Sequence, residues 1–472
     1  MPAEHTGPRR PLDLAGIGIG PFNLSLAALA ARVHGLTTAF YERRTEFRWH
    51  PGLLIEGTTL QVPFLADLVT LADPTSPFSF LNYLRVRERL YPFYFAERFH
   101  AHRAEYDAYC RWVSGQLPGL HFGHQVEDVR WNAGRGLFEA DFAQLDAAGE
   151  AAALGRAHAR NLVVGVGTEP YVPKALRPLA ASPAADVVHS ADYLTHRARL
   201  VAAGHVTVVG AGQSGAEVFL DLLRARPAGA EGLHWLARTP AFAPMEYSKL
   251  GLEQFTPDYA RYFHGLSEDV RDELLPRQWQ LYKGIDAGTL AAVHEELYRR
   301  TLGGGWPDAV LTPGVTVRTA GRLGSDRIEL HLEHAAQGAR ETLRTDAVVL
   351  ATGYRERPLE GLLAPLEPLL RRDAAGRPQV DEQHRLVLDP EVTGRIYVQN
   401  AERHTHGVGA PDLGLAAYRS AVILDDVTGA EPYPLPRRTA FTTFGLRRSR
   451  REPPDEPAHG IPRAPDPGTV KA

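Results

Sequence analysis

Short apolar runs that lead into glycine recur along the chain. They lie in three regions, residues 12–35, 205–226 and 346–354. In the first two regions, the apolar residues after the glycines recur at helical spacing, which predicts a strand, a tight turn and a helix in each. Between the second and third regions, Leu290, Val293, Leu297 and Tyr298 are spaced for one face of a further helix. Strands that alternate with helices predict an α/β fold.

The first region has the pattern of a dinucleotide-binding unit, Gly18-x-Gly20-x-x-Asn23. Gly18 permits the tight turn, Gly20 lets the backbone approach a pyrophosphate, and the helix N-terminus supplies N–H groups and a positive dipole. A second strand ends at Glu42, where an acid would bind a ribose hydroxyl. Because Asn23 replaces the usual third glycine, a glycine-rich turn without a nucleotide remains the alternative.

The second region repeats the pattern more strictly, as Gly210-x-Gly212-x-x-Gly215. The strand that follows ends near Arg238, and no carboxylate stands where an NAD site has one. A guanidinium suits the extra 2′-phosphate of NADPH, so this unit predicts NADPH rather than NADH. The alternative is a solvated arginine at a strand end.

Two such units predict two nucleotides, or one nucleotide and one vestigial fold. The usual division places a flavin in the first unit and a reduced nicotinamide in the second. Apolar runs at residues 161–170 and 346–354 are typical of the junctions between two such domains. The prediction is therefore two Rossmann-like dinucleotide-binding domains with a smaller, mostly helical substrate region. They comprise an FAD-binding domain at 11–170 and 346–430, an NADPH-binding domain at 171–345 that includes the helical substrate-binding region at 245–306, and a mostly disordered tail at 433–472.

Several longer motifs resemble the microbial N-hydroxylating flavoprotein monooxygenases, which act on lysine, ornithine or diamines for hydroxamate siderophores. The motifs are GIGPFNL at 18–24, QVPFLADL at 61–68, DPTSPFSFLNY at 73–83, ATGY at 351–354 and NAERHTHG at 400–407. The resemblance covers roughly residues 13–424. It implies FAD held without a covalent link, reduced by NADPH. Dioxygen then gives a C4a-hydroperoxyflavin that an amine lone pair attacks.

The resemblance also implies roles for individual residues. By position, Gln61, Trp49 and His50 are expected near the flavin ring as catalytic residues, although Trp49 could instead be a core aromatic. The residues expected to bind the cofactors are Gly18, Gly20, Pro21, Asn23, Glu42, Gly210, Gly212, Gln213, Ser214, Gly215, Arg238, Thr352 and Gly353.

Departures from the family pattern indicate the substrate. Amino-acid members carry a lysine where Ala66 stands, and ornithine members an asparagine where Leu252 stands. We align Leu281 with a third polar position. A substrate carboxylate buried there would lose its solvation without a partner. A lysine about 4 Å from a second ammonium would repel it by about 4 kcal/mol at an effective dielectric near 20.

These departures predict a small diamine, cadaverine or putrescine, in place of an amino acid. The alternative is an L-lysine N6- or L-ornithine N5-monooxygenase whose carboxylate partners lie elsewhere. Glu246 or Glu253 could hold the distal ammonium, but each could equally be a solvated acid.

Composition narrows the remaining choices. The formal charge of −4 does not favour binding to nucleic acid or to an anionic membrane. Cys110 is the single cysteine, which excludes a dithiol relay and makes a disulfide reductase a poor alternative. Residues 1–11 contain no apolar run that could serve as a signal peptide, so a cytoplasmic location is expected. His404 and His406 lack a third ligand in sequence, so no metal is expected.

The expected partners are a small diamine and dioxygen, with no nucleic acid and no membrane. The family resemblance implies a homo-oligomer, a tetramer or dimer. Two other functions stay open: a flavin monooxygenase that oxidises carbonyls or sulfur, and a non-catalytic flavoprotein that senses redox state.

Overall fold

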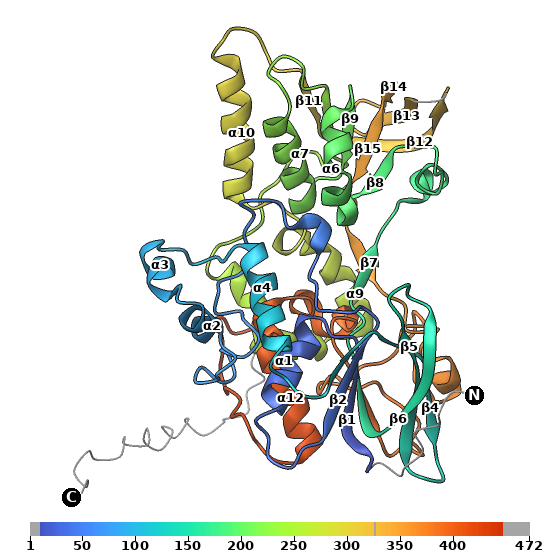
Figure 1. Cartoon of the computed structure of the whole chain (residues 1–472). Coiled ribbons are helices and arrows are strands. Elements are labelled where there is room, and N and C mark those ends of the chain that lie inside the picture. The colour runs from blue at the N-terminus through green and yellow to red at the C-terminus, as the bar shows by residue number, and fades with distance from the viewer. Residues whose placement is uncertain (1–9, 325–326, 447–472) are drawn as a thin grey trace, which may run out of the picture.

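The computed structural model describes residues 10–324 and 327–446. It contains two large sheets at opposite ends of the molecule (Figure 1). The first is mixed, with the order β3-β2-β1-β6-β5-β4 and with β17 also paired to β6. Its strands are β1 (Leu12–Ile17), β2 (Thr38–Glu42), β3 (Leu120–Phe122), β4 (His124–Asn132), β5 (Leu137–Leu145), β6 (Ala151–Val164) and β17 (Arg395–Val398).

Strand β6 organises this sheet because it is 14 residues long. Its second half pairs in parallel with β1 and β17, and its first half pairs antiparallel with β5. The helices α1 (Pro21–Ala30) and α12 (Ala416–Thr428) lie side by side against the parallel part (Figure 1). All ten residues of α1 are buried, which accounts for its nearly uniform apolar sequence.

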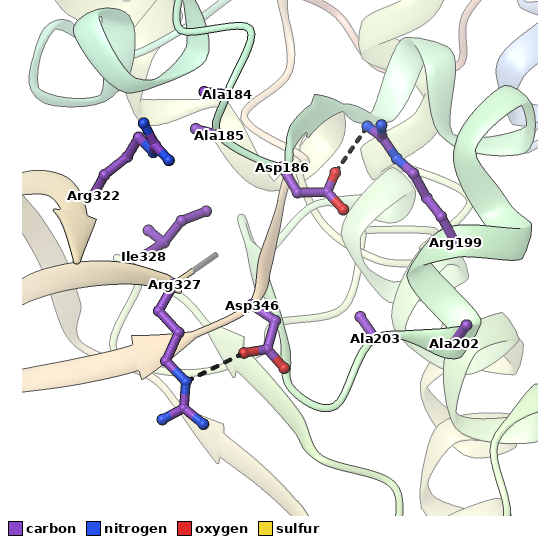
Figure 2. A pocket seen from close by; sticks show the side chains of 10 residues that line it. All are labelled: Ala184, Ala185, Asp186, Arg199, Ala202, Ala203, Arg322, Arg327, Ile328 and Asp346. Carbon is purple, nitrogen blue, oxygen red and sulfur yellow. Dashed lines mark ion pairs between the residues drawn. The ribbon is translucent and has the colours of Figure 1, made fainter. Parts of the chain in front are cut away.

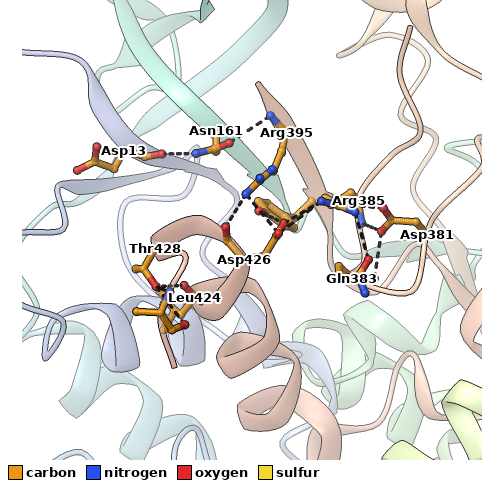
Figure 3. Close-up of polar contacts among 11 residues, drawn as sticks. Asp13, Asn161, Asp381, Gln383, Arg385, Arg395, Leu424, Asp426 and Thr428 are labelled. Atoms are coloured by element: carbon orange, nitrogen blue, oxygen red, sulfur yellow. Dashed lines mark hydrogen bonds and ion pairs between the residues drawn. The ribbon is translucent and has the colours of Figure 1, made fainter. Parts of the chain in front are cut away.

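Polar contacts hold the C-terminal segment against this sheet (Figure 3). The Asn161 side chain on β6 donates to the Asp13 carbonyl of β1 and accepts from the Arg395 N–H of β17, at 3.0 and 3.2 Å. Asp426 on α12 accepts from the Tyr397 hydroxyl at 2.6 Å and lies 3.3 Å from Arg395. Residues more than 200 positions apart are thereby joined into one domain.

The second sheet is parallel, with the order β11-β10-β9-β15-β8. Its strands are β8 (Val187–His189), β9 (Val206–Val209), β10 (Leu233–Leu236), β11 (Ala309–Thr312) and β15 (Ala347–Leu350). A separate antiparallel sheet of β12 (Val315–Leu323), β13 (Arg327–His334) and β14 (Arg340–Thr345) packs beside it. The helices α6 (Tyr193–Ala202), α7 (Gln213–Ala225) and α10 (Ala287–Thr301) complete this domain (Figure 1).

The placement of β15 corrects the predicted domain boundary at residue 346. Strand β15 forms hydrogen bonds with β9 on one side and β8 on the other, so it belongs to the second sheet. The chain returns to the first domain only after Leu350, along β16 (Tyr354–Glu356), which pairs antiparallel with the outgoing β7 (Thr168–Pro170). The two crossings therefore form one two-stranded connection between the domains.

The region at 245–306 is largely helical, as the sequence predicts. Its elements before α10 are η4 (Gly251–Phe255), α8 (Pro257–His264), α9 (Glu268–Arg277) and η5 (Trp279–Leu281). On α10, Leu290, Val293 and Leu297 pack against the core of the second domain. Tyr298 does not share that face, because 57% of it is exposed.

The prediction of a disordered tail from residue 433 is wrong for the segment at 433–446. Tyr433 is buried and donates its hydroxyl hydrogen bond to the Leu29 carbonyl at 2.8 Å. The backbone N–H groups of Phe441 and Thr442 donate to the Glu253 carboxylate at 2.9 and 2.8 Å. These contacts hold the segment at 433–446 against both α1 and η4, and the rest of the predicted tail lies outside the described residues.

The remaining elements are short, apart from α4. These are α2 (Phe80–Val86), α3 (Leu90–Phe95), α4 (Arg103–Ser114), α5 (Arg177–Ala180), α11 (Arg403–His406), η1 (Pro51–Leu53), η2 (Lys174–Leu176), η3 (Ser190–Asp192), η6 (Ala364–Leu369), η7 (Gly407–Gly409) and η8 (Leu413–Leu415). In the part of the chain that the structure describes, no helix combines the length and apolar character needed to cross a bilayer.

Candidate active site

The first glycine loop joins β1 to the N-terminus of α1. Gly18 has a φ of +85°, and a Cβ there would lie 2.5 Å from the Gly165 carbonyl oxygen, so only glycine fits. A Cβ at Gly20 would meet nothing within 4 Å, which leaves the helix N-terminus open to a ligand. Pro21 occupies the first turn, where its missing N–H costs no helical hydrogen bond. This open N-terminus is suited to a phosphate.

Asn23 is fully buried beneath the loop. Its side-chain amide donates to the carbonyls of Ile17 and Gly18, at 3.1 and 2.7 Å, and its oxygen accepts from Gln399 at 2.8 Å. Glycine at 165 leaves room for it, because a Cβ there would lie 2.7 Å from the Asn23 amide nitrogen. The geometry gives Asn23 a role in holding the loop, and its side chain does not project toward the open side.

Glu42 ends β2 next to this loop. One of its carboxylate oxygens accepts from the Ile19 N–H and the other from the Arg44 N–H, both at 3.0 Å. The carboxylate thus lies at the loop, where the ribose acid of a dinucleotide site is expected.

The second loop joins β9 to α7. Gly210 has a φ of +131°, and a Cβ on it would overlap the Ala351 carbonyl. Gly215 lies so close to Gly210 that a Cβ would overlap that residue's carbonyl oxygen, so its role is close helix-to-strand packing. Gly212 is the N-cap of α7.

Gln213, one of the predicted cofactor residues of this loop, makes three contacts with its side chain. It donates to Glu217 at 2.8 Å and to the Thr289 hydroxyl at 3.0 Å, and it accepts from the Asp286 N–H at 2.7 Å. These bonds tie the start of α7 to the start of α10. Ser214, in the first turn of the same helix, is half-buried.

Cations gather on the open side of the second loop. Arg238 is exposed, just after β10. Lys283 is also exposed, and partial enclosure together with the charges of Arg403 and Arg238 lowers its pKa. The Lys283 carbonyl oxygen would lie 3.6 Å from a Cβ on Gly212. Arg238 and Lys283 suit the phosphates of a nucleotide, whereas Arg403 is paired with Glu356 at 3.4 Å. Neither Lys283 nor Arg403 was identified from the sequence.

The ATGY segment lies where the chain leaves the second sheet. Gly353 has a φ of +83°, and its carbonyl accepts from Tyr171 at 2.9 Å and contacts the His189 imidazole at 3.1 Å. The Thr352 hydroxyl donates to the Tyr171 carbonyl at 2.6 Å. Both residues therefore fasten the interdomain connection in this structure.

Trp49 and His50 lie between the two domains. Their rings are 5.1 Å apart, His50 is 5.5 Å from the Tyr354 ring, and Trp49 is 5.1 Å from Tyr106. His50 has a left-handed backbone, with φ of +47°. Although its side chain is accessible to solvent, the surrounding protein and then the charges of Arg103 and Arg44 lower the pKa of His50 to about 4. Its imidazole is therefore neutral at pH 7.

Arg103 connects the predicted catalytic residues to the second domain, and the sequence did not reveal it. It is buried at the start of α4 and donates to the Gln61 side chain and the Thr59 carbonyl, both at 3.2 Å. It also forms an ion pair with Glu217 on α7 at 2.7 Å. Burial raises the pKa of Glu217, and Arg103 opposes that shift.

The three predicted substrate residues lie in different surroundings. Ala66 is buried, with 5% of its surface exposed, and lies near Gly414. Leu252 is half-buried on η4, which packs against η7. Leu281 is buried in an apolar cluster with Phe263 and Val408, so it acts as core beneath the site.

The two acids suggested for the distal ammonium are not arranged for that task. The Glu253 carboxylate is bound to the backbone at 441–442. Glu246 is exposed and accepts the Ser248 N–H at 2.6 Å.

The histidines of the NAERHTHG motif lie behind the site. His406 is buried, with its ring stacked 4.1 Å from that of His384, and His404 contacts the Pro378 carbonyl at 2.9 Å. Among the described residues, no group of three or more His, Cys, Asp or Glu side chains is placed to hold a metal ion.

Two pockets lie away from the glycine loops. One of about 410 Å³ lies between α6 and the β12–β13 pair (Figure 2). There Asp186 pairs with Arg199 at 2.8 Å and Asp346 with Arg327 at 3.8 Å. The other, of about 390 Å³, lies between α8 and α12 beside His406. No predicted site residue lines either pocket.

Two glycine loops at helix N-termini, with an aromatic and arginine cluster between them, define an oxidoreductase of the two-dinucleotide class. The sequence matches the family described as L-lysine 6-monooxygenase/L-ornithine 5-monooxygenase over residues 10–356. The chain belongs to this family of monooxygenases.

Several described proteins are similar in sequence or structure to nearly the whole chain. The rhizobactin siderophore biosynthesis protein RhbE of Rhizobium meliloti is 43% identical over 448 residues, 93% of this chain and 96% of RhbE. The putrescine N-hydroxylase of Shewanella oneidensis is 40% identical over 452 residues, 95% of this chain and 87% of that enzyme. The crystal structure of DfoA bound to FAD, a cadaverine monooxygenase from Erwinia amylovora, is 37% identical with a TM-score of 0.87, covering 94% of this chain and all of DfoA.

Proposed function

We propose that this protein uses FAD and NADPH to hydroxylate one primary amine of a small aliphatic diamine, putrescine or cadaverine, for hydroxamate siderophore biosynthesis. The observation that carries the proposal is Ala66, a buried alanine where amino-acid-specific relatives carry a lysine. A site without that cation lacks this partner for a substrate carboxylate, but it admits a second ammonium. The descriptions of the putrescine and cadaverine enzymes support the same substrate class.

The residues of the first loop fit a flavin dinucleotide. The open space at Gly20 leaves room for a pyrophosphate at the N-terminus of α1, and Glu42 would bind the ribose. Bound there, the flavin would use electrons from NADPH to activate dioxygen, of which one oxygen atom is transferred to the amine and the other leaves as water. Gly210, Gly212 and the Arg238–Lys283 pair of cations would hold the NADPH phosphates.

The residues between the loops would orient the reactants. Gln61 and Trp49 would lie at the flavin ring, with Gln61 held by Arg103 at 3.2 Å. The low pKa of His50, about 4, keeps its imidazole neutral near a cationic substrate, because a charged ring would repel the ammonium. The reacting amine needs its lone pair, so uncharged surroundings that favour the neutral amine assist the reaction.

The test is a hydroxylamine assay with the purified holoenzyme. We expect NADPH-dependent product from diamines of four or five carbons, and little product from lysine or ornithine. Equal or greater product from either amino acid would overturn the diamine assignment. Oxygen insertion into a ketone or sulfide without any hydroxylamine would overturn N-hydroxylation itself.

We also propose a cytoplasmic homo-oligomer. The buried, unpaired Cys110 is compatible with a reducing compartment. Tyr91, Tyr94 and Phe95 on α3 are each 70% exposed or more and form an apolar surface of a kind that subunits often bury. Light scattering of the purified protein tests the assembly, and a monomer at micromolar concentration would refute it.

A further inference from the structure

Asp412 lies beside Ala66, although the two residues are far apart in sequence. It precedes η8, and its Oδ1 accepts the Gly414 N–H at 2.7 Å. A Cβ placed on Gly414 would lie 2.8 Å from Asp412 Oδ1 and 4.0 Å from the Ala66 Cβ. The carboxylate and the alanine methyl therefore approach each other across Gly414, where a larger residue would clash with the carboxylate.

Asp412 makes no ion pair with any residue in the described ranges 10–324 and 327–446. The cation that acts on it, Arg419, is itself paired with Glu402 at 2.7 Å and donates to the Ala410 carbonyl at 2.7 Å. The charge of Asp412 also acts on the Tyr247 phenol. Burial raises the pKa of Asp412 to about 6, and the Gly414 N–H and Arg419 oppose that shift. At pH 7 Asp412 is thus a half-buried anion without a cation of its own.

The other carboxylates of this region are committed to hydrogen bonds elsewhere. Glu253 binds the backbone at 441–442, Glu246 is exposed and accepts from Ser248, and Asp286 caps α10 through the Thr289 N–H at 2.9 Å. Asp412 uses one oxygen for its cap, and its second oxygen accepts no hydrogen bond from the residues that the structure describes.

We propose that Asp412 binds the distal ammonium of the substrate and so places the other amino nitrogen for hydroxylation. This inference rests on the diamine function proposed above. A carboxylate attracts an alkylammonium through a charge-assisted hydrogen bond and repels the α-carboxylate of an amino acid. One residue thereby favours the diamine and disfavours lysine and ornithine. Ala66 contributes because a lysine in its place would reach Asp412 and replace the substrate ammonium.

The test compares two substrates in Asp412→Asn. Asparagine keeps an oxygen for the Gly414 N–H and removes the charge. The substrates are 1,4-diaminobutane and n-butylamine, which differ only in the distal amine. We expect wild type to prefer the diamine, and Asp412→Asn to raise KM for the diamine on the order of 10- to 100-fold with little change for butylamine. FAD content and melting temperature should stay at wild-type values.

Asp146→Asn is the matched control. Asp146 is exposed and caps a turn in the same way, with its Oδ1 accepting the Ala148 N–H at 2.8 Å. We expect unchanged kinetics with both amines. Equal losses for both amines in Asp412→Asn would assign Asp412 a structural role and overturn the proposal, as would an unchanged KM for the diamine. Wild type that hydroxylates no diamine would instead refute the proposed function, and that result needs no variant.

The pH dependence provides a second readout. Because the carboxylate is charged above its pKa of about 6, KM for the diamine should rise as pH falls below 6 in wild type. The ratio of the diamine KM to the butylamine KM removes the titration common to both reacting amines. That ratio should lose its pH dependence in Asp412→Asn, and an identical pH dependence in both proteins would contradict the proposal.

Discussion

Asn23 shows how one side chain can stand where a dinucleotide loop usually has glycine. At the equivalent position of the second loop, Gly215 allows α7 to approach Gly210 directly. In the first loop the glycine is instead at 165, on the neighbouring strand end, and the asparagine side chain fills the space between. The close packing is preserved because volume lost on one segment is gained on the other.

We expect Asn23→Ala to lower the free energy of unfolding by about 2–4 kcal/mol and to weaken FAD retention. The substitution removes three buried hydrogen bonds and leaves the Gln399 amide without its acceptor. Urea denaturation and the ratio of flavin to protein after gel filtration measure the two effects. A variant with wild-type stability and flavin content would show that the bonds contribute nothing net.

Ala66→Lys tests the substrate site at the same scale. The new ammonium would lie beside Asp412, pair with it and repel a diamine, so kcat/KM for putrescine should fall at least on the order of 100-fold. Ala66→Met provides similar bulk without charge and should cost less. Equal losses in the two variants, measured by hydroxylamine formation, would indicate that volume rather than charge excludes the substrate.

At the scale of elements, glycines in the two loops serve different purposes. Gly20→Ala adds a methyl group to open space, so stability should stay within about 0.5 kcal/mol of wild type while FAD affinity falls. Gly215→Ala drives a methyl group into the Gly210 carbonyl and should destabilise the second domain by about 1–3 kcal/mol. Calorimetry and flavin titration separate these outcomes. Intact FAD affinity in Gly20→Ala would mean that no phosphate approaches this residue.

Features that depend on neighbours in sequence were predictable from the sequence. Each glycine loop and the helix after it follow from local spacing, and the loops are where the prediction placed them. The predicted boundary at 346 was wrong because β15 inserts between β9 and β8, a pairing that no local pattern encodes. The roles of Arg103 and Asp412 were not predicted for the same reason. Their contacts with Glu217 and Ala66 join residues more than 100 positions apart.

At the scale of the whole molecule, the two domains are joined by the packing of η1 against η3 and α6 and by more specific contacts. The chain crosses between them in the β7–β16 pair, and the Arg103–Glu217 ion pair connects α4 of one domain to α7 of the other. Arg103 also holds Gln61, so the contact that joins the domains also positions a residue expected at the flavin. The relative position of the nucleotide sites is thereby coupled to the geometry of the flavin site.

A double-mutant cycle at Arg103 and Glu217 tests this coupling. The Glu217 side chain is only 4% exposed. Arg103→Met leaves its carboxylate without a cation, so the substitution should lower the free energy of unfolding by about 3–5 kcal/mol. Glu217→Gln in the Arg103→Met background should recover part of that loss, because the remaining group is neutral. If the ion pair holds the domains together, we expect wild type to unfold in one calorimetric transition and Arg103→Met to unfold in two. Arg103→Met should also slow flavin reduction by NADPH, and the double variant should still reduce slowly. Additive stability losses with an unchanged reduction rate would mean that other contacts, such as the β7–β16 connection and the packing of η1 against η3 and α6, maintain the interdomain geometry.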